Sequence, residues 1–316
     1  MTYRDTVLAD SPAGYWRLGE ASGTTAADET GNFPGTYTSG SNGGPTLGVA
    51  GLLTGDADTA IFIPEQTSHG WVDLGTPNST STLDGWTWEV WLNTGSTAES
   101  FPGIFGELST EDPGRLLQSH QGETWTFEVR LYTGTSVSTK SVTGMPYDTT
   151  MHLVVTVEDA QTSSPTTRVY RDGTQIASWN DYGTSLTAPY RQQGLAVRDN
   201  SVNRYFGTLD EAAFYTSALS AARVQAHYDA GTSGQLSTPT GWTFVKTTDT
   251  AQVVGTWNAV TDAATYDYEV QVWSGSTWGA FASGTTTDPT TTFTLDSSDG
   301  VTFSTLYRAR VRAVPA

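Results

Sequence analysis

Residues 86–92 read Trp-Thr-Trp-Glu-Val-Trp-Leu, and this stretch decides the fold class. Every second residue from Trp86 to Leu92 is a large apolar one, so four apolar side chains would point to one face of an extended strand. Residues 126–132 and 152–157 show the same strand character. The sequence therefore predicts several half-buried β-strands.

Composition and turn chemistry favour the same class. Threonine supplies 55 of the 316 residues, and Thr, Val, Tyr, Trp and Phe all favour strands over helices. Asp172-Gly173 separates two strand-like runs, 167–171 and 174–177. Because Asp-Gly readily adopts the positive φ angles of a two-residue turn, this segment is predicted to be a β-hairpin.

One segment departs from the β pattern. Residues 217–231 are predicted to form a short helix, with Ser220 as its N-cap and Gly231 beyond its end. Val224 and Tyr228 are four positions apart and would face the body of the domain. We therefore expect this helix to pack on the sandwich.

A domain boundary is predicted close after that helix. Residues 231–239 are small and polar and include glycine and proline, which is typical of a linker. We therefore divide the chain into a first domain, 1–234, and a second domain, 235–316.

Composition also excludes several classes of site and partner. The sequence has no cysteine, which excludes disulfides, thiol nucleophiles and cysteine-ligated zinc. The formal net charge is −18 and only two residues, Lys140 and Lys246, are lysines. Since nucleic-acid binding needs clustered basic residues, we expect no nucleic-acid partner. No apolar run of about 18 residues occurs, so no membrane insertion is predicted.

Six stretches of the first domain follow one another in a characteristic order. They are 13–20, 28–32, 86–92, 172–173, 207–215 and 218–220. In this order they resemble the laminin G-like, concanavalin A-like jelly-roll family over most of residues 3–231. The resemblance implies a large antiparallel sandwich for the first domain.

The second domain resembles fibronectin type III. Trp257 stands at the place of the tryptophan of strand B, residues 266–272 resemble strand C, and residues 305–314 resemble strand F. The resemblance implies that Tyr307 is the corner tyrosine whose hydroxyl bonds back to the backbone. Too few residues follow for the last strand, so we expect an open edge that a neighbouring chain covers, or a shortened chain. The predicted fold is all-β: a large antiparallel jelly roll followed by a small fibronectin type III-like sandwich.

The sequence offers little catalytic chemistry. A glycosidase needs two carboxylates on one face, but Asp210 and Glu211 are adjacent and would point to opposite faces of a strand. Asp267 and Glu269 share a face but lie in the second domain. The four histidines have neither a nucleophile elbow nor metal-ligand spacing and are interpreted as ordinary surface or strand residues. We therefore predict no enzyme, with a free-standing glycosidase as the alternative that reducing-sugar release would test.

Asp28, Asn32 and Asp210 are the candidate metal ligands, because calcium prefers carboxylate and carbonyl oxygens. The resemblance also implies calcium, since relatives often carry one such structural ion. In the alternative interpretation, Asp28 and Asn32 form a side-chain-capped turn and Asp210 accepts backbone amide bonds.

Trp179, Asn180, Tyr182 and Tyr190 are the candidate carbohydrate-binding residues. They place aromatic rings and amides in irregular segments, a combination that stacks on sugar rings and bonds their hydroxyls. Trp71 beside His69 is a weaker candidate, and the alternative for any of these tryptophans is that it fills the core.

We predict a non-enzymatic bacteriophage virion protein, a minor tail or surface-decorating adhesin. Tandem β modules are typical of exposed surfaces, no secretion signal is recognised at the start, and arginine outnumbers lysine 13 to 2. The expected partners are other virion proteins, further copies of the chain in a homo-oligomer and a host-surface glycan. The alternative is an extracellular carbohydrate-binding region of a secreted bacterial polysaccharide-degrading enzyme, and genome neighbours would separate the two.

Overall fold

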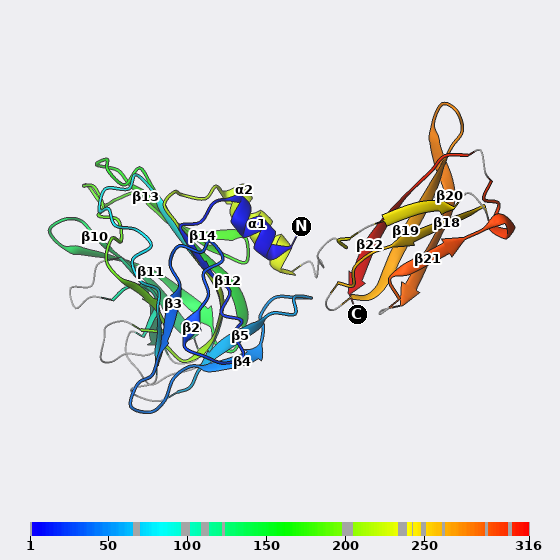
Figure 1. Cartoon of the computed structure of the whole chain (residues 1–316). Helices are drawn as coiled ribbons and strands as arrows, with labels where there is room; N and C mark the ends of the chain where they lie inside the picture. Colours follow the sequence, from blue (N-terminus) through cyan, green and yellow to red (C-terminus); the bar gives the residue numbers. More distant parts are fainter. Residues whose placement is uncertain are drawn as a thin grey trace. The chain divides into compact units, whose positions relative to one another are not determined.

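A computed structural model gives the arrangement of most of the chain (Figure 1). It describes residues 2–65, 70–95, 102–108, 114–121, 124–197, 205–232, 239–241, 243–247, 251–260, 263–287, 290–302 and 305–315. The chain divides into two compact units. The larger unit holds residues 4–52 and 58–229, and the smaller unit holds residues 230–316 with two short segments, 1–3 and 53–57. The predicted boundary at 234/235 lies outside the described residues.

The larger unit contains two eight-stranded antiparallel sheets. The first sheet has the order β14 (Thr174–Trp179), β13 (Thr166–Arg171), β12 (Thr150–Glu158), β7 (Trp86–Thr94), β16 (Gly207–Tyr215), β5 (Thr59–Ile63) and β4 (Thr46–Ala50), and β1 (Gly14–Trp16) also pairs with β16. The second sheet has the order β11 (Val137–Pro146), β10 (Thr124–Tyr132), β9 (Arg115–Gln121), β8 (Gly103–Glu107), β15 (Gln193–Leu195), β6 (Trp71–Asp73), β3 (Gly35–Thr38) and β2 (Thr25–Ala26). This is the predicted antiparallel jelly-roll sandwich.

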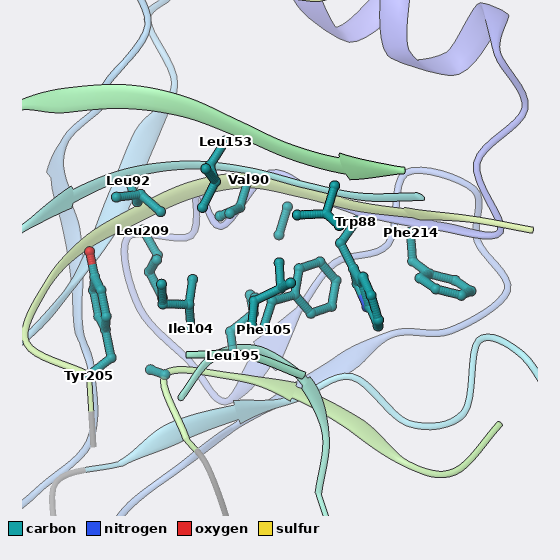
Figure 2. Close-up of a cluster of buried hydrophobic side chains, with 14 of the residues drawn as sticks. Trp88, Val90, Leu92, Ile104, Phe105, Leu153, Leu195, Tyr205, Leu209 and Phe214 are labelled. Carbon is teal, nitrogen blue, oxygen red and sulfur yellow. The ribbon is translucent and has the colours of Figure 1, made fainter. Parts of the chain in front are cut away.

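The core lies between the facing sides of the two sheets. Figure 2 shows Trp88, Val90 and Leu92 of β7 pointing towards Phe105 and Leu195 of the second sheet, and all five are buried. Burying a side chain of this size stabilises the fold by about 1.5–3 kcal/mol. The alternation read from the sequence therefore does define the face of β7 that packs on the core.

The prediction that β7 is half-buried is wrong. Glu89 and Trp91, which point to its opposite face, are also buried. Helix α2 (Ala221–Thr232) contacts both residues, since His227 bonds to Glu89 and Tyr228 stacks on Trp91. A second helix, α1 (Tyr3–Ala9), was not indicated by the sequence. The two lie side by side (Figure 1) and are joined by a hydrogen bond of 3.2 Å from the Arg223 guanidinium to the Thr6 carbonyl.

Helix α2 begins as predicted and ends later. The Ser220 hydroxyl accepts the N–H of Arg223 at 3.3 Å, which confirms the N-cap. Gly231 is a helical residue and does not lie beyond the end. Its carbonyl accepts the N–H of Thr54 at 3.0 Å, so this terminal acceptor is satisfied without a left-handed glycine. Val224 is buried, as expected, and Tyr228 stacks on the ring of Trp91.

Two local features of the strands depend on unusual backbone angles. The hairpin between β13 and β14 is confirmed, with φ of 52° at Asp172 and 76° at Gly173. In β16 the pairing register shifts between Asp210 and Ala213, and Glu211 has φ of 51°. The bulge interrupts the alternation from which opposite faces were predicted for Asp210 and Glu211.

The smaller unit consists of two three-stranded antiparallel sheets. One has the order β17 (Thr243–Thr247), β18 (Gln252–Thr256), β21 (Thr292–Leu295), and the other β20 (Trp278–Thr287), β19 (Ala263–Trp273), β22 (Tyr307–Pro315), with a short helix η1 (Ser297–Asp299) after β21. Trp257 follows β18 directly and is buried against Tyr266. The Tyr307 hydroxyl accepts the N–H of Thr302 at 3.1 Å, the backward bond expected of a corner tyrosine.

No described helix is long and apolar enough to cross a membrane.

Candidate functional site

Three of the four predicted carbohydrate-binding residues lie together at one edge of the sandwich, at the end of β14 and just after it. Trp179 and Tyr182 pack partly against the core, and Asn180 between them is exposed. The Tyr182 hydroxyl donates to Thr167 at 2.9 Å, and burial raises the pKa of Tyr182 to about 12. Lys140 of β11 lies 5.1 Å from the centre of the Tyr182 ring. These two rings therefore help to close the edge between β11 and β14.

Tyr190 belongs to a different part of the molecule. The buried carboxylate of Glu107 in β8 accepts the backbone N–H groups of Tyr190 and Arg191 at 2.6 and 3.0 Å. Burial raises the pKa of Glu107. The Gln192 amide donates to Asp73 of β6. Segment 190–192 therefore lies against β8 and β6, whereas residues 179–182 lie at the edge between β11 and β14.

Asp73 is part of a polar and aromatic surface on the side of the second sheet that points away from the core. Val72 packs in the core, so its neighbours Trp71 and Asp73 point outwards. On the paired strand β3, Thr38 lies opposite Trp71 and Thr36 lies opposite Asp73. We call Thr36, Thr38, Trp71, Asp73 and Gln192 the Trp71 face. His69, the other member of the weaker prediction, lies outside the described residues.

The Trp71 face has the chemistry of a sugar-binding surface. Trp71 and Asp73 are half-buried, so each is held in place while part of it remains accessible. An indole ring stacks on the apolar face of a sugar, and carboxylate, amide and hydroxyl groups bond its hydroxyls. Gly194 of β15 lies next to Asp73, and the Leu108 side chain occupies the space where a Cβ on Gly194 would lie.

Glycoside hydrolysis would need a second carboxylate close to Asp73. The outward-pointing Glu128 of β10 is four strands from β6, about 19 Å at the usual spacing of about 4.8 Å. Glycosidase carboxylates lie about 5–10 Å apart. Asp73 can therefore orient a ligand, but Glu128 is too distant to act with it in acid–base catalysis.

The predicted metal ligand Asp28 is occupied by hydrogen-bond donors. Its carboxylate accepts the backbone N–H groups of Tyr15, Thr30, Asn32 and Phe33 at 2.8–3.0 Å and the Thr30 hydroxyl at 2.6 Å. Burial acts to raise its pKa, but the bonds from Thr30 and from the backbone hold the pKa of Asp28 below its usual value. This is the side-chain-capped turn of the alternative interpretation, and a carboxylate so used does not fit a cation.

Asn32 and Asp210 differ in how their side chains are engaged by hydrogen bonds. The Asn32 side-chain amide donates to the Thr30 hydroxyl at 3.1 Å. Asp210 is 2% exposed, and its Oδ2 accepts the N–H of Leu52 at 2.8 Å. Its Oδ1 has no hydrogen-bond partner in the described part of the chain. Burial raises the pKa of Asp210 well above its usual value, and the negative charge of Glu211 raises it further. Of the two predicted carboxylate ligands, only Asp210 has an oxygen that no hydrogen-bond donor reaches in the described part of the chain.

A buried polar network that the sequence did not indicate lies under α2. Glu89, His152 and His227 are each 0% exposed. Glu89 accepts from His152 Nε2 at 2.8 Å, His227 Nδ1 at 2.9 Å and the Tyr215 hydroxyl at 2.7 Å. The other ring nitrogen of His227, Nε2, lies 2.8 Å from Asp10 Oδ2. His152 is a strand residue, as interpreted, but it is buried in this network. His227 is a buried helical residue, so its interpretation as an ordinary surface or strand residue is wrong.

The charges of this network balance. His227 lies between the carboxylates of Glu89 and Asp10, and Arg223 donates to Asp10 at 2.8 Å. Burial acts to lower the pKa of His227, but Glu89 and Asp10 hold that pKa above its usual value. Burial acts to raise the pKa of Glu89, but the charge of His227 holds it well below its usual value. Two cations and two anions thus offset one another, as buried charges require.

The network serves structure. It joins α2 and the residue after α1 to three central strands of the first sheet, β7, β12 and β16. Within the described ranges, no group of three or more histidine, aspartate or glutamate side chains could hold a metal ion.

Two solved structures similar to this chain share its fold at low sequence identity, and a third is similar to part of it. The botulinum neurotoxin serotype D binding domain is 8% identical, with a TM-score of 0.51 over 78% of this chain and 61% of that chain. The binding domain of Paraclostridial Mosquitocidal Protein 1 is 9% identical, with a TM-score of 0.50 over 86% and 68%. Trypanosoma rangeli sialidase with the inhibitor DANA is 13% identical, with a TM-score of 0.46 over 68% of this chain and 32% of that chain. The chain thus spans about a third of the sialidase.

None of the curated proteins matches this chain. A family model matches half of it. The model describes the concanavalin A-like lectin/glucanases superfamily and matches residues 66–225. This range begins shortly before β6, includes both central strands β7 and β12, and ends within α2. The match and the jelly-roll sandwich agree, and the chain belongs to the concanavalin A-like lectin/glucanases superfamily.

Proposed function

We propose that the chain is a non-catalytic carbohydrate-binding protein whose glycan site is the Trp71 face. The observation that carries this proposal is the placement of Trp71, Asp73 and Gln192 on one accessible surface of the second sheet, by strand alternation and by the bond from Gln192 to Asp73. Trp71 stacks on the sugar ring, and Asp73 and Gln192 bond its hydroxyls.

The absence of catalysis is part of the proposal. Glu128 lies too far from Asp73 for the two carboxylates to act as a catalytic pair. The buried histidines are engaged in the network under α2. A single shallow site binds weakly, so many copies on one particle provide the avidity that adhesion needs. We therefore expect binding without release of reducing sugars.

A glycan array tests the site, with the wild-type chain displayed as a multivalent conjugate beside two variants. Trp71→Ala should lose binding to every glycan that the wild-type chain retains. Trp179→Ala is the matched control, because Trp179 is also a half-buried tryptophan at the end of a strand, and it should keep that binding. Loss in Trp179→Ala together with full binding in Trp71→Ala would overturn the assignment of the site.

The biological setting we propose is a bacteriophage virion, with the chain as a minor tail or surface-decorating adhesin in several copies beside other virion proteins. What supports it is the sequence: tandem surface-type β modules and 13 arginines against two lysines. The second module is proposed to be of the fibronectin type III kind, from its six strands and the bond to Tyr307. Capsid and tail genes beside this gene are the expected observation; a polysaccharide hydrolase in the same reading frame would favour the extracellular accessory region.

We propose one structural calcium ion at Asp210. The buried Oδ1 of Asp210, which no described hydrogen-bond donor reaches, is an acceptor that a cation would satisfy. Glu211 and Asp58 are paired with Arg17, so the other ligands would be backbone carbonyls and water. Asp28 and Asn32 are not part of that proposal, because their side chains are used in the turn.

A further inference from the structure

Strand β22 in the smaller unit has a free edge. In the sheet β20-β19-β22, the described part of the chain pairs β22 with β19 alone. Natural edge strands are usually protected by charges, proline or bulges, because their unpaired N–H and C=O groups can bind another strand. The one proline of β22 is its last residue, Pro315, and its register with β19 is regular from Tyr307 to Ala313. Charge is the protection that remains.

That charge is a row of three arginines. Arg308, Arg310 and Arg312 alternate along β22 and point to the outer face of the sheet, and the side chains of Arg310 and Arg312 are 79% and 76% exposed. On the β19 side, Arg310 contacts Glu269 at 2.5 Å and Arg312 contacts Asp267 at 2.8 Å. These contacts hold the guanidinium groups near the strand, and their high exposure leaves donors for a second acceptor.

Arg308 lacks a carboxylate on β19. It donates to the amide oxygen of Gln271 at 2.7 Å and lies 4.6 Å from the ring centre of Trp278. The row therefore carries three positive charges against the two negative charges of Asp267 and Glu269, in a chain whose net charge is −18. An acidic partner is attracted to this strip of the surface.

The inner face of β22 is incompletely covered. Its apolar residues pack against the small core but stay half-exposed, whereas Tyr266 and Val270 of the neighbouring strand β19 are fully buried. The half-exposed residues are Tyr307, Ala309, Val311 and Ala313. Leu306, just before the strand, is 63% exposed. An added strand with apolar side chains at alternate positions would cover the inner row.

A second copy of this strand is a poor occupant. If two β22 strands paired, their arginine rows would lie on the same face and meet, and like charges directly opposite each other destabilise a sheet. Residues 266–270, in which two acidic residues alternate with apolar ones, are already paired inside β19. The charge of the arginine row instead favours an acidic segment of another protein.

We propose that the free edge of β22 binds an extended segment of another protein in which acidic side chains alternate with apolar ones over about seven residues. The acidic side chains bridge to Arg308, Arg310 and Arg312, the apolar ones cover the inner row, and backbone hydrogen bonds join the two strands. The interaction is separate from the Trp71 face and does not depend on glycan binding.

Peptide binding to the full-length chain tests this proposal by fluorescence anisotropy. The probe is a labelled peptide with three glutamates alternating with valines between threonine ends. One control is the same peptide with lysines in place of glutamates. Two further controls are forms of the acidic peptide that are N-methylated at alternate residues, so that each form lacks the backbone N–H donors along one of the two edges of the extended peptide. The variants are Arg308→Gln/Arg310→Gln/Arg312→Gln and, as matched control, Arg168→Gln, another arginine at a strand surface paired with an acid, Glu158.

The acidic peptide should bind, with the lysine peptide at least about tenfold weaker. The triple variant should bind the acidic peptide at least about tenfold more weakly, and Arg168→Gln should bind it as wild type does. One of the two N-methylated forms should lose binding, because it lacks the N–H groups that face β22. Two peptide results would overturn the proposal: no binding at about 1 mM peptide, or equal binding of both N-methylated forms and the unmodified peptide. A dimer in sedimentation equilibrium would also overturn it, if the triple substitution strengthened the dimer or left it intact and the peptide did not dissociate it.

Discussion

Replacing Glu89 by alanine should be strongly destabilising, because one fully buried carboxylate accepts hydrogen bonds from His152, His227 and Tyr215. The substitution leaves those donors without this acceptor and leaves the His227 cation facing Asp10 alone. Breaking a buried ion pair by removing one partner costs about 3–5 kcal/mol. For a unit of this size a loss of 1 kcal/mol lowers the melting temperature by about 2–4 °C. The expected decrease is therefore about 6–20 °C.

Differential scanning calorimetry measures this change, with Glu158→Ala as the matched control. Glu158 is a glutamate in the same sheet with an ion pair of 2.7 Å to Arg168, but its side chain is 39% exposed. Exposed pairs contribute about 0–1 kcal/mol, so the control should melt within about 4 °C of wild type. If Glu89→Ala also melted within that range, the network would not hold α2 on the sheet, and the reasoning would be refuted.

Three further outcomes are expected. Stability should fall as the pH rises above neutrality, because the pKa of His227 is raised in the folded chain; its contribution is full below about pH 6.5, the value for an unperturbed histidine, and is lost as the pH rises through the folded pKa. Urea unfolding along a pH series should show this slope in wild type and a flatter one in His227→Gln, whereas equal slopes would contradict it. Asp28→Ala should lower the free energy of unfolding by about 2–4 kcal/mol, because the turn loses the acceptor of its hydrogen bonds; a urea-unfolding loss below about 1 kcal/mol would show that the turn does not need it. Calcium should raise the melting temperature of wild type and a chelator should lower it, with no response in Asp210→Asn, and a wild type indifferent to both would remove the calcium proposal.

The sequence predicts the parts of the fold that depend on neighbouring residues. Alternation identified the face of β7 that enters the core, Asp172-Gly173 identified a hairpin, and Ser220 identified the start of α2. Each of these signals lies within one strand, one turn or one helix end, so local physics is sufficient to recognise it.

The burial of the other face of β7 could not be predicted in this way. Glu89 is buried because His227, 138 positions later, reaches it, and His227 is held in turn by Asp10, 217 positions earlier. A glutamate in an alternating strand looks like a solvent-facing residue unless the covering helices are known. Helix α1 has seven residues, too few for a clear periodic pattern.

The same limit applies to the candidate site. Trp71 and Asp73 were visible in the sequence as neighbours, but the bond between Asp73 and Gln192 spans 119 positions. Tyr190 was grouped with Trp179 and Tyr182 because they are close in the sequence. In the segment between them, Thr187 instead pairs with Tyr132 of β10, and Tyr190 then bonds to Glu107 of β8.

The most direct test of glycan binding at the Trp71 face is an NMR titration that follows the indole N–H signals of the 11 tryptophans. The signals of Trp71 and Trp179 are assigned by Trp→Phe substitution, and the glycan is the strongest ligand from the array. The Trp71 signal should move in proportion to bound glycan while the Trp179 signal stays in place. A Trp71 signal that does not move while another tryptophan responds would contradict glycan binding at the Trp71 face.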